Sequence, residues 1–96
     1  MKTFPLAKPI QAHGEEVTEL KLREPTGEDV EDCKGLPYFL EDGETILINT
    51  KTAMKYVSRC AGIPMGSVRQ ILPGDLNNLF WWVAGFFLNQ GAKRPS

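Results

Sequence analysis

The chain has 96 residues, of which 42% are apolar and 24% charged, and its formal net charge is −1. This is the composition of one ordinary globular domain, and the near-zero charge excludes a global basic field that would attract nucleic acid or an anionic membrane. Residues 1–5 lack the continuous apolar stretch of a signal peptide, so we expect a cytoplasmic protein.

The N-terminal part of the chain has the pattern of a β-hairpin. Residues 3–11 and 17–23 alternate between apolar and polar side chains, and Gly14 lies in the turn between them. Pro5 and Pro9 cannot donate to a strand ladder, which places the first strand at an edge. An isolated hairpin is marginal in water, so this one must lie on helices or pair with another chain.

A short acidic helix is predicted next, ending near Gly35. Thr26 suits the N-cap, and Asp29 suits the third helical position of a capping box. Negative charge in the first turns is favourable because the N-terminal end of a helix is positive. This explains the acidic cluster without a metal ion, although metal binding is the alternative reading of its members, Glu28, Asp29, Glu31 and Asp32.

The middle of the chain is predicted to be an irregular connection followed by a long helix. Residues 36–43 have no clear period and carry scattered apolar anchors. From Glu44 or Thr45 to Ala61 the period is helical, and Gly62 followed by Pro64 ends the helix. One face of this helix should be apolar, formed by Ile46, Leu47, Thr50, Ala53, Met54, Val57, Cys60 and Ala61.

A short helix over residues 65–72 and a terminal helix from Pro73 complete the chain. The terminal helix holds ten consecutive apolar or small residues, 79–88, but at roughly 15 Å they cannot cross a bilayer. Helical spacing predicts that its core face is made by Leu76, Leu79, Phe80, Val83 and Phe87. The other side holds Trp81, Trp82, Phe86 and Leu88.

A helix that is apolar on every side must be surrounded by protein, and a domain of this size has few elements with which to surround it. Either the helix is the central pillar of the fold, or its second side contacts another chain. We therefore take that second side, the four residues Trp81, Trp82, Phe86 and Leu88, as the candidate protein-interaction site.

No catalytic, cofactor or metal site is predicted. His13 is the only histidine and lies in a predicted turn, and Cys33 and Cys60 are expected to be buried thiols rather than a disulfide. The helix that ends at Gly62 and the short helix after it could imitate a helix-turn-helix, but the second helix offers only Ser67, Arg69 and Gln70 toward bases.

Several short motifs occur in an order that resembles a known family. Residues 20–30, LKLREPTGEDV, resemble an L-x-L-R-E-P-x-x-x-D signature, and residues 6–10, LAKPI, resemble the opening L-x-K-P-(I/V) strand. A Gly-(I/L)-Pro turn follows at residues 62–64. After it, at residues 72–76, comes the segment LPGDL, in which a leucine precedes an aspartate at the start of the terminal helix. On these residues the chain resembles the small tail assembly chaperones of Mu-like and P2-like contractile-tailed phages and prophages.

The resemblance implies a virion assembly factor that is not an enzyme and works in the bacterial host. Such chaperones are thought to bind the long tape-measure protein and to assist assembly of the tail tube. The tape-measure protein and the tail tube protein are therefore the expected partners, with no membrane, nucleic acid or cofactor. The family also allows a longer form made by translational frameshifting. A homo-oligomer is a further possibility, which comes from the apolar second side of the terminal helix.

Taken together, the sequence predicts an α+β domain, an N-terminal β-hairpin followed by about four helices of which the last is strongly apolar. Its parts are a hairpin over residues 1–25, a helical part over residues 26–90 and a flexible tail over residues 91–96. The predicted function is phage tail assembly chaperone. The alternative is a small prophage DNA-binding or regulatory protein.

Overall fold

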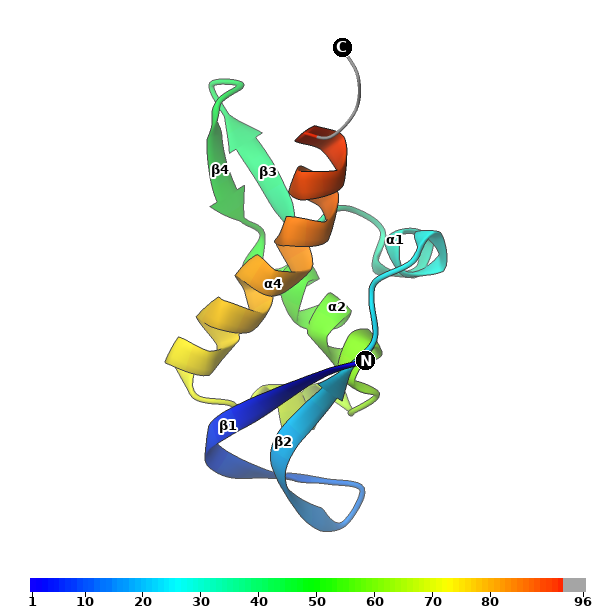
Figure 1. The fold of residues 1–96 in the computed structure, drawn as a ribbon, viewed down its shortest axis with the longest axis vertical. Coiled ribbons are helices and arrows are strands. Elements are labelled where there is room, and N and C mark those ends of the chain that lie inside the picture. The colour runs from blue at the N-terminus through cyan, green and yellow to red at the C-terminus, as the bar shows by residue number, and fades with distance from the viewer. Residues whose placement is uncertain (93–96) are drawn as a thin grey trace.

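The computed structural model describes residues 1–92 of the chain. It confirms the predicted α+β class, with two antiparallel hairpins at opposite ends of the molecule and helices between them (Figure 1). In chain order the elements are β1 (Lys2–Ala12), β2 (Glu15–Leu22), α1 (Gly27–Cys33), β3 (Tyr38–Glu41), β4 (Thr45–Ile48), α2 (Thr50–Ala61), α3 (Met65–Val68) and α4 (Pro73–Ala92).

The first hairpin, β1–β2, forms as predicted. Its turn is made by His13 and Gly14, whose φ angles of 55° and 77° match the left-handed conformations of a type I′ turn. The buried side chains of the hairpin include Ile10, Leu20 and Leu22. These residues pack into one cluster with residues of the helices, which solves the stability problem of an isolated hairpin.

Side chains of the helical part also bind the backbone of β1. The pairing of β1 with β2 shifts register between Pro5 and Ile10. Within this bulge the N–H of Ala7 donates to Asp75 Oδ2 at 2.8 Å. Farther along, Gln70 Oε1 accepts from the N–H of Gln11 at 2.7 Å. The proline-containing opening strand is therefore held by α4 and by the segment before it.

The short acidic helix α1 is also confirmed. Thr26 is its N-cap, and the capping box is complete: the Thr26 hydroxyl accepts from the Asp29 N–H, and the Asp29 carboxylate accepts from the Thr26 N–H. Lys34 ends the helix with a φ of 58°, and its N–H donates to the carbonyl groups of Val30 and Glu31. Local capping therefore sets where this helix begins and ends.

The prediction for residues 36–48 is wrong. In place of an irregular connection and the start of a long helix, the structure has a second hairpin, β3–β4, in which Phe39 pairs with Leu47. Asp42 and Gly43 form its turn, with φ angles of 55° and 75°. Asp-Gly between two apolar runs is a strong hairpin signal. The helix predicted from Glu44 therefore begins only at Thr50, where Asn49 caps it.

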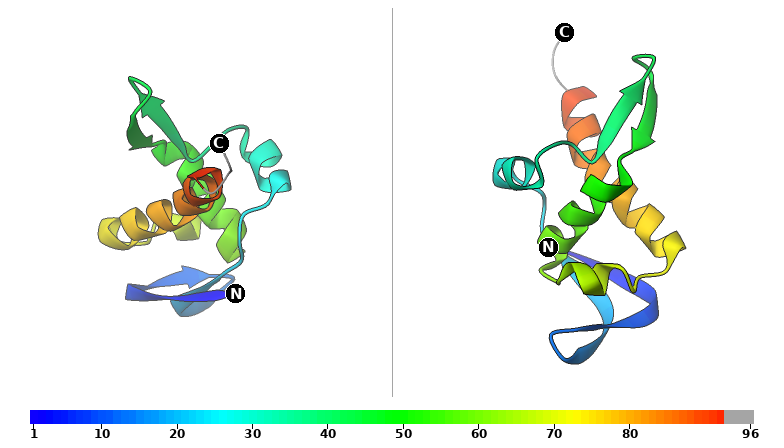
Figure 2. Two further views of the ribbon diagram at one scale, coloured as in Figure 1. Left: turned by 45° about the horizontal axis from the view of Figure 1, so that its top comes forward. Right: turned by 180° about the vertical axis from the view of Figure 1, so that it is seen from behind.

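The helices α2 and α4 cross at the centre of the molecule (Figures 1 and 2). From α2 the residues Ala53, Tyr56, Val57 and Cys60 are buried. On α4 Leu79, Phe80 and Val83 are buried, while Leu76 and Phe87 are half-buried and pack against the same core. The predicted core face of the terminal helix is thus the face that meets α2. The helix continues to Ala92, and the rest of the predicted tail lies outside the described residues.

Candidate functional site

The outer side of α4 is the candidate site, and the structure divides its four predicted residues between two flanks. A helix turns 100° per residue, so Trp82 and Phe86 share one flank, and Trp81 and Leu88 share the other. The rings of Trp82 and Phe86 meet edge to face, with 4.9 Å between centroids. Gly85 has no side chain and lies between the two flanks.

The flank with Trp82 and Phe86 borders two hollows in the protein surface. The smaller has a volume of about 140 Å³, and the larger about 350 Å³. Phe86 lines both of them, so the two hollows are neighbours along α4. The smaller is completed by Pro25, Thr26, Gly27, Val30 and Phe87, and the larger by Trp82, Met1, Lys2, Leu22, Arg23 and Glu24.

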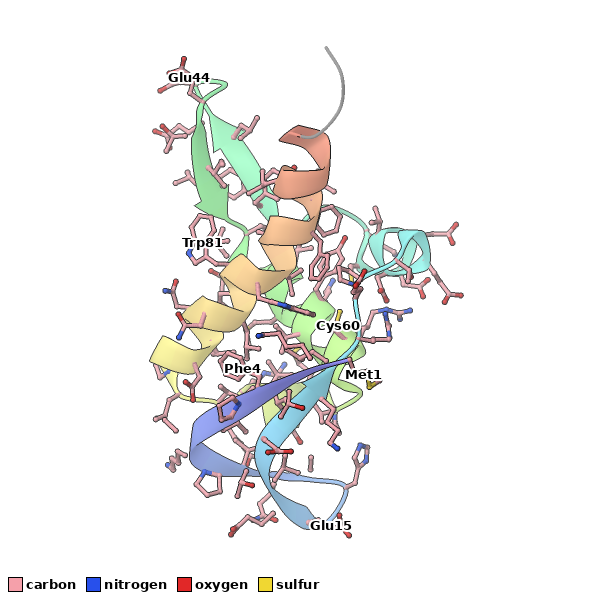
Figure 3. All side chains as sticks on the ribbon, in the orientation of Figure 1. Met1, Phe4, Glu15, Glu44, Cys60 and Trp81 are labelled. Carbon is pink, nitrogen blue, oxygen red and sulfur yellow. The ribbon has the colours of Figure 1, made fainter. Side chains whose placement is uncertain are left out.

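The other flank is more open. Trp81 is 43% exposed and lies on the side of α4 that is nearer to β4 (Figure 3). Leu88 is half-buried, as are Trp82 and Phe86. None of the four predicted site residues is fully buried, whereas Leu79 and Val83 on the inner side are. The outer side of α4 therefore presents apolar side chains that the domain itself covers only in part.

Phe87 follows Phe86 in α4 and holds this part of the helix against the core. Its ring packs edge to face against the ring of Tyr56, with 5.6 Å between centroids, and against Tyr38 at 6.4 Å. Tyr56 is fully buried, and its hydroxyl donates to the Gly35 carbonyl at 2.6 Å. Burial raises the pKa of Tyr56 to about 12. The phenol therefore stays neutral and fixes α2, α4 and the end of α1 relative to one another.

The wall opposite Trp82 and Phe86 is the segment between β2 and α1, and a buried carboxylate holds it in place. Asp29 has no exposed side-chain surface and accepts from both terminal nitrogens of Arg23, at 2.8 and 2.9 Å. Arg59 Nε donates to the same carboxylate at 2.6 Å and pairs with Asp32 at 2.8 Å. Two members of the acidic cluster, Asp29 and Asp32, thus bind arginines of this chain, which no local spacing predicted.

These contacts also explain the chemistry of the Arg–Glu–Pro–x–x–x–Asp part of the signature. The hydrogen bonds that Arg23 donates to the Asp29 carboxylate hold its pKa well below the usual range. Burial opposes this shift, and hydrogen bonds from Arg59 and the Thr26 N–H add to it. The Arg23 backbone N–H donates to the Cys60 carbonyl at 3.0 Å. The signature residues therefore connect the first hairpin to α1 and α2 and position one wall of the site.

The two cysteines are buried thiols, as predicted. Burial raises the pKa of Cys60 to about 11 and also raises that of Cys33. A thiol kept neutral in this way is a poor nucleophile and a poor metal ligand. Within residues 1–92 no group of three or more metal-ligating side chains gathers, and none of the helices described there is long and apolar enough to cross a membrane.

The helix-turn-helix reading does not fit the geometry. The helix that would enter the major groove is α3, which has four residues. The Ser67 hydroxyl donates to the Gln11 carbonyl at 2.6 Å. The Gln70 side chain accepts from the Gln11 N–H through Oε1 and donates to the Gln11 carbonyl through Nε2. Two of the three polar side chains that DNA reading would need, Ser67 and Gln70, are therefore occupied in holding β1.

A comparison with known protein families supports this description of the chain. The model of a family described as "Phage tail assembly chaperone proteins, E, or 41 or 14" matches residues 3–88. Those residues include both hairpins except Lys2, the Asp29 ion pairs and all four predicted site residues. No curated protein and no solved structure matches the chain.

Proposed function

The chain belongs to the family of phage tail assembly chaperones, and from this membership we propose that it binds the tape-measure protein through the outer side of α4. The observation that supports the proposal most is the half-buried pair Trp82–Phe86, whose rings meet edge to face at 4.9 Å between centroids beside two surface hollows. Binding hot spots are enriched in tryptophan and lie in pockets at the centre of an interface.

The chemistry of this surface fits an amphipathic helix of the client. Such a helix docks its apolar stripe against a groove and inserts side chains spaced at i, i+3, i+4 and i+7. Large apolar side chains of the client would enter the hollows on either side of Phe86. Gly85 lets the client backbone approach α4 closely, and Trp81 and Leu88 then border the client on the other flank.

Weak binding by many copies suits a chaperone that coats a long protein only until assembly. Each site is small, so a single contact is weak, but many copies along one tape-measure chain together keep its apolar stripe from water. The arriving tail tube protein can then displace the copies one at a time. Release of the chaperone during tube growth needs no chemical step in this scheme.

The proposal is tested by co-expressing the chain with the tape-measure protein of the same phage. The double variant Trp82→Ser, Phe86→Ser should lower the soluble fraction of the client severalfold, because loss of a hot-spot aromatic costs about 2 kcal/mol or more in binding. Leu72→Ser is the matched control, since Leu72 is also a partly exposed large apolar residue, at 38%, and lies just before α4.

The control should keep the client soluble, and circular dichroism should show that both variants are folded. If the folded double variant solubilises the tape-measure protein as well as the wild type does, then the outer side of α4 is not the client site.

A further inference from the structure

The second hairpin, β3–β4, carries apolar side chains on both of its faces. Successive residues of a strand point to opposite faces, so Phe39 and Leu40 lie on different faces of β3. They are 50% and 52% exposed, the two most exposed large apolar residues after Met1. A two-stranded sheet also leaves one edge of each strand without a strand neighbour within residues 1–92.

The two hairpins of the chain differ in how their edges are protected. In the first, β1 carries Pro5, Pro9 and a register shift, and β2 carries charged side chains along its length. Prolines, bulges and charges are the devices by which natural sheets prevent pairing with other chains. The core of β3, Tyr-Phe-Leu, has none of these devices and consists of residues that favour strands.

We propose that β3 is a self-association edge that pairs antiparallel with β3 of a second copy, forming a four-stranded sheet in the order β4–β3–β3–β4. A free strand edge presents alternating backbone donors and acceptors, and the partner that satisfies them is another strand. Pairing also turns two marginal two-stranded sheets into one of four strands. This proposal does not depend on the client site of α4.

The charges at the two ends of the hairpin select the antiparallel orientation. The turn carries the carboxylates of Glu41, Asp42 and Glu44, and Glu44 lies at the far tip of the molecule (Figure 3). The exposed Lys34 and Lys51 lie shortly before β3 and shortly after β4. Parallel pairing would place the two acidic turns together, whereas antiparallel pairing places each turn beside the lysine-containing base of the partner.

The symmetry is that of an ordinary dimer. In an antiparallel pair around a two-fold axis, the same residues contribute from both copies, so Phe39 and Leu40 of one copy lie against those of the other. The strand has only four residues, so the interface is at the small end of specific contacts. We expect dissociation constants between about 10 µM and 1 mM.

The experiment is sedimentation equilibrium of the full chain across that concentration range. The wild type should rise from a mass of 10.7 kDa to twice that value. The double variant Phe39→Lys, Leu40→Lys should associate at least tenfold more weakly, because lysines on both faces of the edge repel their symmetry copies. Leu72→Lys adds charge at another exposed apolar position and should dimerise like the wild type.

Hydrogen exchange of the wild type gives a second readout that needs no variant. Amide groups of β3 should become more protected as concentration rises, while those of β1 should not change. A wild type that stays at 10.7 kDa up to about 1 mM, a double variant that dimerises as strongly as the wild type, or β3 amides with concentration-independent exchange would each overturn the proposal.

Discussion

Replacing Asp29 with Asn should lower the free energy of unfolding by about 3 kcal/mol at neutral pH, the lower end of the range for breaking a buried ion pair. The variant keeps the shape of the side chain but removes the charge that Arg23 and Arg59 share. The cost stays at the lower end because the two arginine side chains are 37% and 34% exposed and can turn to water. Urea titration measures the change.

The same site predicts a pH dependence with a definite sign. The pKa of Asp29 is lower in the folded than in the unfolded chain, so its stabilisation is present above the unfolded value of about 4 and is lost as the pH falls below it. The difference between wild type and Asp29→Asn should therefore shrink from about pH 4 to about pH 2. A difference that is constant over this range would show that the carboxylate charge is not what stabilises the segment.

Thr26→Ala is the matched control for this site. It removes the cap hydroxyl, which accepts from the Asp29 N–H at 3.4 Å and donates to Asp29 Oδ2 at 3.3 Å, and it leaves both arginines beside the carboxylate. We expect a loss of about 1 kcal/mol, the usual value for a helix cap. A loss as large as that of Asp29→Asn would assign the main stabilising role to the cap rather than to the arginines.

Leu79→Ala should lower the free energy of unfolding by about 3–4 kcal/mol, because truncating a fully buried leucine loses transfer energy and leaves a cavity. Leu79 has no exposed surface, whereas Trp81 on the same helix is 43% exposed. Trp81→Ala should therefore cost less than about 1 kcal/mol although it removes more atoms. Denaturant titration of both variants checks which side of α4 is the core, and equal costs would contradict the assignment.

The parts of the fold that the sequence predicted are those with local causes. Three features each determine the structure of only a few neighbouring residues: Gly14 in its turn, the Thr26–Asp29 capping box and Pro73 at the start of α4. The second hairpin was missed because Ile46 and Leu47 fit the helical stripe that continues through Ala53 as well as they fit a strand. A short apolar run cannot be assigned by period alone, and here the turn signal at Asp42 and Gly43 was the better guide.

The candidate site was predictable in composition but not in shape. Trp81 and Trp82 are adjacent in sequence, yet the helical turn places them on different flanks of α4, and only Trp82 contacts Phe86. The wall opposite them depends on the pairing of Asp29 with Arg59, which is 30 residues away in sequence. An ion pair over that separation leaves no spacing pattern. The sequence therefore explains the acidic cluster by the capping box and the helix dipole and does not reveal the arginine partners.

The central claim is that the tape-measure protein binds the outer side of α4, and the indole signals of the two tryptophans test it most directly. In a proton–nitrogen correlation spectrum each tryptophan gives its own indole N–H signal, assigned with the single variants Trp81→Phe and Trp82→Phe. Adding a soluble helical segment of the tape-measure protein should shift or broaden the Trp82 signal. Binding that is seen by mass while the Trp82 signal stays unchanged would contradict the account.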